Sequence, residues 1–315
     1  MARTILRVED LWKIYGSAEA VKGISFAVET GEFFGLLGPN GAGKTSTIGM
    51  ITGWVTPSRG RVEIGGVDLS GRAREAKKWV GLVPQNFAFY PRLTAEENLS
   101  FFGSLYGVQG GTLKERTARV LEMVSLTGRA GQRVETFSGG MKRRLNIAIG
   151  LIHDPAILIL DEPTVGIDPQ SRRAILDTVK ELNRQGMTIL YTTHYMEEAQ
   201  ELAHRVGIID HGELIALGTQ AELVRQVGEQ QTLRLQFEED QSVAALAEKF
   251  ACLPGVARVK AEDHSLALLG ESAERMLPPA VQLCGEVGLR LRTVQIQEPN
   301  LEALFLHLTG RALRD

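Results

Sequence analysis

Short runs of apolar residues predict strands that are covered on both faces of a sheet. Residues 33–37 read FFGLL, residues 157–160 read ILIL, and a third run, ILYTT, ends at residue 193. Unbroken apolar runs are typical of parallel sheets, because helices cover both faces of such sheets. The chain is therefore predicted to contain an α/β domain.

Apolar positions at helical spacing predict two helices between the first two of these strands. Thr94 and Glu97 form a capping-box pair at the start of one helix, whose expected apolar face carries Leu99, Phe102 and Tyr106. Ser138 is a favourable N-cap for the other helix, whose apolar positions are Leu145, Ile147, Ala148, Leu151 and Ile152. The connection between the two strands is therefore expected to be helical.

The last part of the chain shows a different order of elements. Strands are predicted at 232–237, 257–260, 265–269 and 289–297, with helices at 242–253, at 273–286 and from Leu301. Asp263 and His264 provide the turn between the middle strands, and Pro278 with Pro279 is expected to kink or split the second helix. The βαββαβ order predicts a small α+β domain at 227–315 with a ferredoxin-like arrangement.

Composition excludes several classes of protein. The 315 residues include 35 basic and 38 acidic ones, so a net charge of −3 gives no reason to expect a nucleic-acid partner. The apolar runs are far shorter than the ~18–20 residues that span a bilayer, and the start, MARTILRVEDLW, is not a signal peptide. The two cysteines, Cys252 and Cys284, suit a reducing compartment. We expect a cytoplasmic chain that does not itself cross a membrane.

The stretch GPNGAGKTS after the first strand predicts a phosphate-binding loop. Its spacing, with a strand before it and a helix after it, matches the P-loop pattern. Gly41 and Gly43 let backbone N–H groups point at phosphates, Lys44 contacts the terminal phosphates, and the Thr45 hydroxyl can bind Mg²⁺. The predicted nucleotide-binding residues of the loop are Gly38, Pro39, Asn40, Gly41, Ala42, Gly43, Lys44, Thr45 and Ser46.

Two acidic residues follow the second strand. Asp161 emerges at its carboxyl end, where open α/β sheets bind ligands, and is predicted to hold Mg²⁺ through its water shell. Glu162 comes next and is the candidate general base for an attacking water. Asp161 alone could also be a turn or cap residue. Together with the P-loop, the pair predicts ATP hydrolysis.

The sequence SGG at residues 138–140 is a candidate for a second anion site. Ser138 caps the predicted helix, and Gly139 and Gly140 leave backbone N–H groups bare at its positive end. A plain capped helix would explain these three residues by themselves. Two phosphate-binding ends in one chain are expected if the second end closes over a nucleotide that another copy holds.

In this order the motifs resemble those of the ATP-binding cassette (ABC) family. FSGGM at 137–141 is similar to the signature motif L-S-G-G-Q, with Phe137 for Leu and Met141 for Gln, and the second change removes a polar side-chain contact. VGIDP resembles the D-loop, which implies that Asp168 reaches across a dimer. The basic residues at 142–144 are expected to be part of a site or a solvated helix face.

The resemblance also assigns three residues outside these motifs. Tyr15 in LWKIYG looks like the aromatic residue that stacks on adenine, with Trp12 as a rival. Gln85 in GLVPQN resembles the glutamine that contacts Mg²⁺ and the attacking water. His194 resembles the switch histidine that contacts the terminal phosphate.

The family resemblance implies a fold and partners. Residues 1–226 would form a P-loop (RecA-like) ATPase domain with an antiparallel β subdomain and a helical subdomain at about 86–155. Two copies would bind ATP and Mg²⁺ head to tail beneath integral membrane permease subunits encoded as separate chains. The protein would then be peripheral on the inner face of the cell membrane. A soluble ABC ATPase that acts on ribosomes or DNA is the alternative.

Two further segments relate to transport. Six aromatic residues lie close together in the predicted helical subdomain: Phe87, Phe89, Tyr90, Phe101, Phe102 and Tyr106. About half are expected in the core, and the resemblance implies that the rest form a groove for a coupling helix of the membrane subunit. The closing EPNLEALFLHLTG resembles ATPases of type-two ABC exporters, which implies export.

Overall fold

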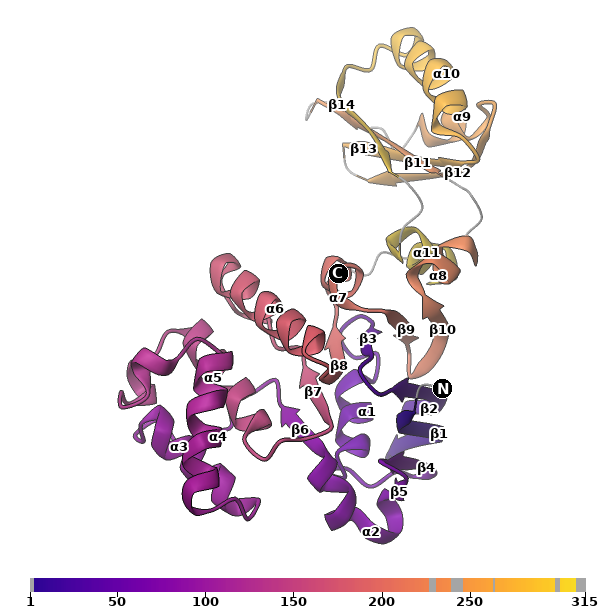
Figure 1. Cartoon of the computed structure of the whole chain (residues 1–315). Helices are drawn as coiled ribbons and strands as arrows, with labels where there is room; N and C mark the ends of the chain where they lie inside the picture. Colours follow the sequence, from indigo (N-terminus) through magenta and orange to yellow (C-terminus); the bar gives the residue numbers. More distant parts are fainter. Residues whose placement is uncertain (1–2, 227–230, 239–245, 263, 298–300, 310–315) are drawn as a thin grey trace. The chain divides into compact units, whose positions relative to one another are not determined.

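The computed structural model describes residues 3–226, 231–238, 246–262, 264–297 and 301–309 (Figure 1). They form two compact units, each with its own hydrophobic core, which divide between Thr219 and Gln220. The helix α8 (Gln220–Gln226) groups with the second unit, where it packs against α11 (Leu301–Thr309). The division therefore comes before α8, whereas the predicted domain boundary follows it.

The first unit is built around a six-stranded sheet. Its strands, in spatial order, are β10 (Glu213–Thr219), β9 (Arg205–Asp210), β3 (Phe33–Leu37), β8 (Thr188–Thr193), β7 (Ile157–Asp161) and β6 (Val80–Val83). Neighbours pair in parallel except β9 with β10. Every residue of β3, β7 and β8 is buried, as their apolar runs predict. The α/β prediction is confirmed.

A second sheet in this unit is antiparallel. Its strands, in spatial order, are β2 (Ala18–Glu29), β1 (Thr4–Tyr15), β4 (Arg59–Ile64) and β5 (Val67–Asp68), followed by α2 (Leu69–Ala76). Phe26 of β2 stacks on Phe34 of β3 with ring centroids 5.1 Å apart. The two sheets and α1 (Lys44–Ile51) share one apolar core. This core holds the start of α1 at the edge where β3 ends.

Three α-helices connect β6 to β7, all within the described residues, and the first and the last of them were predicted. They are α3 (Ala95–Leu105), α4 (Gly110–Met123) and α5 (Gly139–Leu151) (Figure 1). Thr94 and Glu97 form the predicted capping box, with Glu97 N–H donating to Thr94 Oγ1 at 3.1 Å and Thr94 N–H donating to Glu97 at 2.8 Å. The predicted apolar positions of α5 are all buried.

The aromatic residues of this helical subdomain differ from the prediction. Leu99 is buried, but Phe102 is only half-buried and Tyr106 comes after α3 ends, where its exposed ring stacks on His153 with centroids 3.7 Å apart. None of the six aromatic residues is buried. The prediction that about half lie in the core is therefore wrong. Smaller side chains such as Leu99 and Val120 fill that core, and the rings lie at its margin.

Two helices follow the sheet strands and position loops at its carboxyl edge. The first, α6 (Pro169–Arg184), follows β7, and the second, α7 (Met196–Leu202), follows β8. α6 packs against α5 and α7, and α7 packs on β3 and β8. α6 starts directly after Asp168, and α7 starts two residues after His194, both of which were predicted for the site.

The second unit contains a four-stranded antiparallel sheet. The elements after α8 are β11 (Gln231–Phe237), α9 (Ala247–Ala251), β12 (Val256–Glu262), β13 (Ser265–Gly270), α10 (Ala273–Glu286), β14 (Leu291–Gln297) and α11. The spatial order of the strands is β12-β13-β11-β14. The order of elements is the predicted βαββαβ order, and the ferredoxin-like classification stays a prediction.

Two details of this unit differ from the expected ones. Pro278 and Pro279 lie inside α10, which continues as one helix across both. The two residues whose carbonyls lose an intrahelical partner, Glu274 and Arg275, are exposed, so water can satisfy those carbonyls while Met276 packs in the core. Residues 242–245 of the predicted first helix, and Asp263 of the predicted turn, lie outside the described residues.

Candidate active site

The predicted phosphate loop joins β3 to α1. Gly43 is the N-cap of α1 and has φ 106°, a left-handed conformation that favours glycine. A Cβ at this position would come 2.5 Å from the carbonyl oxygen of Ala20. The backbone of the loop therefore requires glycine at position 43, in agreement with the P-loop pattern.

Lys44 lies at the centre of the loop. Its ammonium donates to the carbonyl oxygens of Gly38 at 2.7 Å and Pro39 at 2.9 Å, and it forms an ion pair with Glu162 Oε1 at 2.9 Å. Only 4% of its side chain is exposed. These contacts hold the ammonium group inside the loop, where it can bind the phosphates of a nucleotide.

A pocket of about 250 Å³ opens above this lysine. Its lining residues are Ala20, Asn40, Gly41, Gly43, Lys44, Thr45, Ser46, Gln85 and Glu162. The other predicted loop residues do not line this pocket. The carbonyl oxygens of Gly38 and Pro39 accept hydrogen bonds from Lys44, and that of Ala42 accepts one from Gly212 N–H at 3.0 Å. The fold therefore brings the loop together with Gln85 and Glu162, which are distant in sequence.

Asp161 is the last residue of β7 and is 4% exposed. Burial raises the pKa of its carboxyl group, while hydrogen bonds from Thr192 (2.7 Å) and Thr45 oppose that shift. A carboxylate next to a threonine hydroxyl is a hard-oxygen donor set that fits Mg²⁺. Among the described residues there is no cluster of three or more His, Cys, Asp or Glu that could hold a metal. Mg²⁺ here would take its other ligands from Gln85, which lines the same pocket, and from phosphates and water.

Glu162 adopts a left-handed backbone conformation with φ 45°. Its N–H donates to Thr192 Oγ1 at 3.0 Å, and its side chain is 7% exposed. Besides the Lys44 pair, its Oε2 lies 3.4 Å from Nδ1 of His194, which follows β8. Strained backbone of this kind is common at functional sites. Glu162 and His194 therefore lie side by side at the carboxyl ends of β7 and β8, and their roles stay predictions.

Ser138, Gly139 and Gly140 lie outside the Lys44 pocket. Ser138 caps α5, because its Oγ accepts a hydrogen bond from Met141 N–H at 3.3 Å, and both Ser138 and Gly139 are exposed. A Cβ at Gly140 would come 2.2 Å from Oγ of Ser171, so glycine is required there for close packing. None of these three residues lines the Lys44 pocket.

The family model described as "ABC transporter" matches residues 21–165. The linearmycin resistance ATP-binding protein LnrL of Bacillus subtilis (strain 168) is 49% identical, and the alignment covers 99% of this chain and 100% of that protein. The Nod factor export ATP-binding protein I of Ralstonia nicotianae is 38% identical, with 99% and 95% covered. The chain belongs to the ABC transporter family.

Solved structures agree with this assignment. An ATP-binding subunit of an ABC transporter aligns with a TM-score of 0.65 at 31% identity, covering 71% of this chain and 93% of that one. A dimeric ATP-binding cassette in a post-hydrolysis state, bound to ADP and Pi, aligns with a TM-score of 0.62 at 26% identity, covering 68% and 98%. The prediction of an ATP-hydrolysing subunit of an ABC exporter is confirmed, in preference to a ribosome or DNA ATPase.

Trp12 and Tyr15, the two candidates for the residue that stacks on adenine in this ABC subunit, differ in their surroundings. Trp12 packs within the antiparallel sheet: its indole N–H donates to Asp10 Oδ1 at 2.8 Å, and its ring lies against Gly23. Tyr15 is 49% exposed, and the Lys13 ammonium lies over its ring, 4.8 Å from the centroid. Tyr15 is therefore the more available of the two, although it does not line the Lys44 pocket.

Asp168, the predicted D-loop residue, is the N-cap of α6. Its carboxylate accepts a hydrogen bond from Ser171 N–H at 2.9 Å, and this bond lowers the pKa of the Asp168 carboxyl group. The residue is exposed. Like Ser138, it is thus held at the surface of the protomer and away from the pocket of its own chain.

Sequence reasoning missed the role of Arg143, which it treated only as one of three neighbouring basic residues. The side chain is 3% exposed and donates to the carbonyl oxygens of Pro84 at 2.9 Å and Gln85 at 2.8 Å. Its guanidinium also lies 4.9 Å from the ring centroid of Phe87. The signature helix α5 is thereby tied to the Gln85 segment. The sequence around Arg143 does not indicate this contact, because Arg143 and Gln85 are 58 residues apart.

Proposed function

We propose that two copies of this chain enclose ATP and Mg²⁺ between them and power export through separately encoded integral membrane subunits. One observation carries the proposal: the Lys44 pocket is open and is lined by no residue of the SGG sequence, whose capped helix end is exposed on the same chain. A second copy can supply that helix end to the nucleotide.

Each predicted residue then has a task. Lys44 and the loop amides bind the phosphates, Tyr15 stacks on adenine, and His194 contacts the terminal phosphate. Thr45, Asp161 and Gln85 would hold Mg²⁺, which supplies positive charge that neutralises the phosphates. Glu162, beside both Lys44 and His194, accepts the proton of the attacking water.

The partner copy completes the site. Ser138, Gly139 and Gly140 of one protomer face the terminal phosphate that Lys44 of the other protomer holds, and Asp168 reaches across the same interface. ATP favours the closed pair because only that state makes both sets of contacts. Loss of the terminal phosphate removes the bridge, so the pair can open.

The helical subdomain offers a surface for the membrane subunit. Phe87, Tyr90 and Phe101 are 44%, 49% and 39% exposed, and the Tyr90 and Phe101 rings meet edge to face at 5.0 Å. Arg143 connects the Phe87 ring to the Gln85 carbonyl. A helix of the membrane subunit that packs on these rings would therefore be coupled to the nucleotide pocket.

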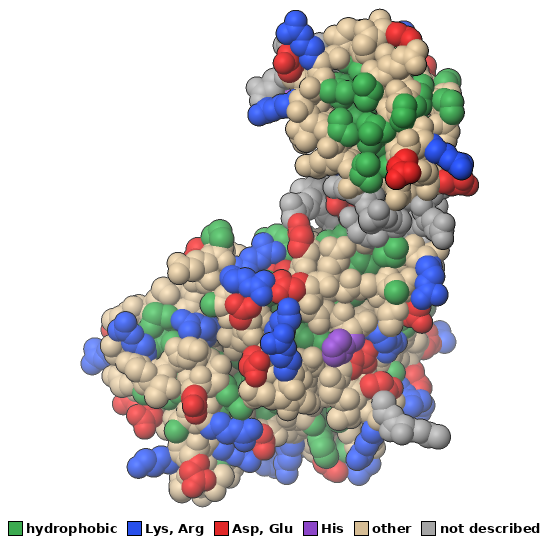
Figure 2. Space-filling model, turned by 45° about the horizontal axis from the view of Figure 1, so that its top comes forward, with side chains coloured by type: hydrophobic (Ala, Val, Ile, Leu, Met, Phe, Trp, Pro, Cys, Tyr) green, Lys and Arg blue, Asp and Glu red, His purple; other side chains and the backbone are tan. Residues whose placement is uncertain are grey.

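Location and direction follow from this arrangement. No helix in the described part of the chain is long and apolar enough to cross a bilayer, so the protein would attach to the inner face of the cell membrane through its partners. Basic and acidic side chains are interspersed on the face of the first unit in Figure 2, which fits the expectation of no nucleic-acid partner. The names of the two relatives, a resistance protein and an export protein, support export.

Phe101→Glu is expected to weaken the complex with the membrane subunits about tenfold, because it places a charge in an apolar contact. The measurement is the amount of multi-span membrane protein that co-purifies from detergent extract. Trp54→Glu is the control, because Trp54 is 79% exposed but lies outside the helical subdomain. Equal recovery with both variants, or recovery of rRNA or DNA without membrane protein, would contradict the proposal.

A further inference from the structure

Glu198 of α7 is a carboxylate buried at the junction of four elements. It is 1% exposed, and each of its oxygens accepts two hydrogen bonds. Oε1 accepts from Thr164 Oγ1 at 2.7 Å and from Arg172 Nε at 2.8 Å. Oε2 accepts from Tyr191 Oη at 2.9 Å and from Thr193 Oγ1 at 2.7 Å. A buried charge is costly unless it is paired in this way.

These donors lie in or next to the two segments that the proposed mechanism uses, the one that carries His194 after β8 and the one that carries Asp168 before α6. Thr193 ends β8 and immediately precedes His194, and its Oγ1 also accepts a hydrogen bond from Tyr195 N–H at 2.9 Å. The Glu198 carboxylate therefore holds a hydroxyl that bridges the residues on either side of His194. This fixes the backbone from which the imidazole projects toward Glu162.

The other two contacts lead to Asp168. Thr164 lies in the segment between Glu162 and Asp168, and its carbonyl oxygen accepts a hydrogen bond from Ile167 N–H at 3.3 Å. Arg172 lies in the first turn of α6, and its N–H donates to the Asp168 carbonyl oxygen at 2.8 Å. Glu198 thus joins the segment that carries Asp168 to the loop that carries His194.

Ring contacts strengthen the same connection. The Arg172 guanidinium lies 4.1 Å from the ring centroid of Tyr195, and the Tyr195 ring lies 4.2 Å from the ring of His194. Arg172 is consequently held between the Glu198 carboxylate and an aromatic ring that contacts the histidine. A shift of α6 would be transmitted to His194 along these contacts.

We propose that Glu198 is a positioning residue that keeps the His194 loop and the Asp168 segment in a fixed relation. It does not line the Lys44 pocket, and it acts through Thr193 and Thr164. The inference rests on the proposed roles of His194 and Asp168. A buried ion pair contributes little net stability compared with apolar packing but specifies one geometry, and a network with every oxygen satisfied is rigid.

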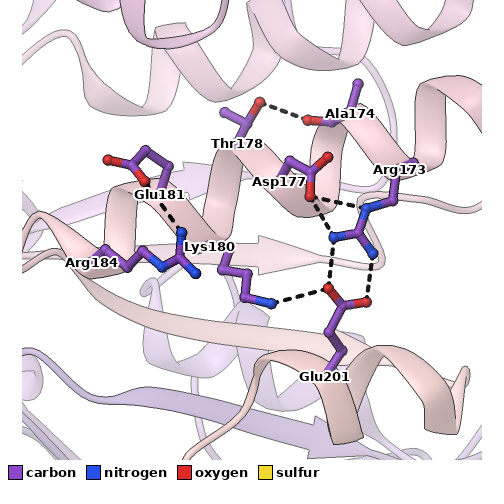
Figure 3. Close-up of polar contacts among 8 residues, drawn as sticks. All are labelled: Arg173, Ala174, Asp177, Thr178, Lys180, Glu181, Arg184 and Glu201. Carbon is purple, nitrogen blue, oxygen red and sulfur yellow. Dashed lines mark hydrogen bonds and ion pairs between the residues drawn. The ribbon is translucent and has the colours of Figure 1, made fainter.

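The chain offers a matched control on the same helix. Glu201 also joins α7 to α6, through Arg173 and Lys180, as Figure 3 shows. Its side chain is 30% exposed, and its bonds run to α6 side chains rather than to Thr164 or Thr193. Glu198→Gln and Glu201→Gln therefore each remove one negative charge between the same two helices. Of the two carboxylates, Glu198 is the one that accepts hydrogen bonds from Thr164 and Thr193.

The test compares kcat, KM for ATP and melting temperature of the full chain. Glu198→Gln is expected to lower kcat about tenfold with KM nearly unchanged, because the amide N–H groups would face the donor hydroxyls of Tyr191 and Thr193. Glu201→Gln is expected to behave like the unmodified chain. Thr164→Val is a milder second variant, which removes one donor and should also lower kcat if Glu198→Gln proves poorly folded.

A double variant separates positioning from general weakening. If Glu198 acts through His194, adding Glu198→Gln to His194→Ala lowers the single-turnover rate no further. A second tenfold fall in the double variant, or unchanged kcat in both Glu198→Gln and Thr164→Val, would overturn the proposal. A His194→Ala variant with full activity would instead refute the proposed role of His194.

Discussion

Glu162→Gln is expected to lower steady-state ATP turnover roughly 100-fold or more while ATP still binds, since a general base contributes about that much. Glutamine matches the size of glutamate but cannot accept the proton of the attacking water. ATP affinity should be retained or rise, because Lys44 would no longer be held by a charged partner at 2.9 Å. Phosphate release measures turnover, and equilibrium titration with a fluorescent ATP analogue measures binding.

The same variant should accumulate as an ATP-bound dimer. Light scattering with excess ATP and Mg²⁺ is expected to give twice the protomer mass for Glu162→Gln and the protomer mass without nucleotide. Glu181→Gln is a suitable control, since Glu181 lies on the exposed face of α6. Turnover at the normal rate in Glu162→Gln would show that another group is the base.

Lys44→Ala is expected to weaken ATP binding roughly 10- to 150-fold, which corresponds to the ~1.5–3 kcal/mol that a hydrogen bond to a charged group contributes. The change removes the cation from the pocket floor, so the terminal phosphates lose their charged partner. Titration of the variant with ATP measures the effect. Lys22→Ala is the control, because the Lys22 ammonium forms a surface ion pair with Glu213 at 3.3 Å.

Lys44→Ala should also lower the melting temperature, because the nearly buried Glu162 would lose its ion-pair partner. Adding Glu162→Ala to Lys44→Ala should recover part of that loss, since no unpaired charge then remains. Unchanged ATP affinity in Lys44→Ala would contradict the account of the pocket. A melting temperature that falls further in the double variant would contradict the stated role of the ion pair.

The sequence predicts those parts of the molecule that local rules govern. The strand at 33–37, the glycine turn and the helix that begins at Lys44 are all present, because apolar runs, glycine conformations and helix caps act within a few residues. The capping box at Thr94 and the cap at Ser138 are confirmed for the same reason.

Tertiary contacts account for the features that could not be predicted. Pro278 and Pro279 remain inside α10 because Met276 on the same helix packs in the core of the second unit. Tyr106 was expected on the apolar face of α3, but that helix ends one residue earlier and leaves the ring exposed. Helix ends of this kind are set by the surrounding packing as much as by local pattern.

Long-range polar contacts explain why two site-supporting residues were missed. Arg143 meets Gln85 across 58 positions, and Glu198 meets Thr164 across 34. In the sequence, Arg143 is one of three consecutive basic residues and Glu198 follows another glutamate, so neither differs from a solvated helix residue. Burial distinguishes them, since both are at most 3% exposed.

Crosslinking between two copies tests the central claim most directly. One copy would carry Ser138→Cys and a differently tagged copy Asn40→Cys, each with Cys252 and Cys284 replaced by serine and with Glu162→Gln to retain ATP. We expect a crosslink between the two tags that forms with ATP and Mg²⁺ and is absent without them. A missing crosslink under ATP and Mg²⁺, or one that forms equally without them, would mean that the nucleotide is not enclosed by two protomers.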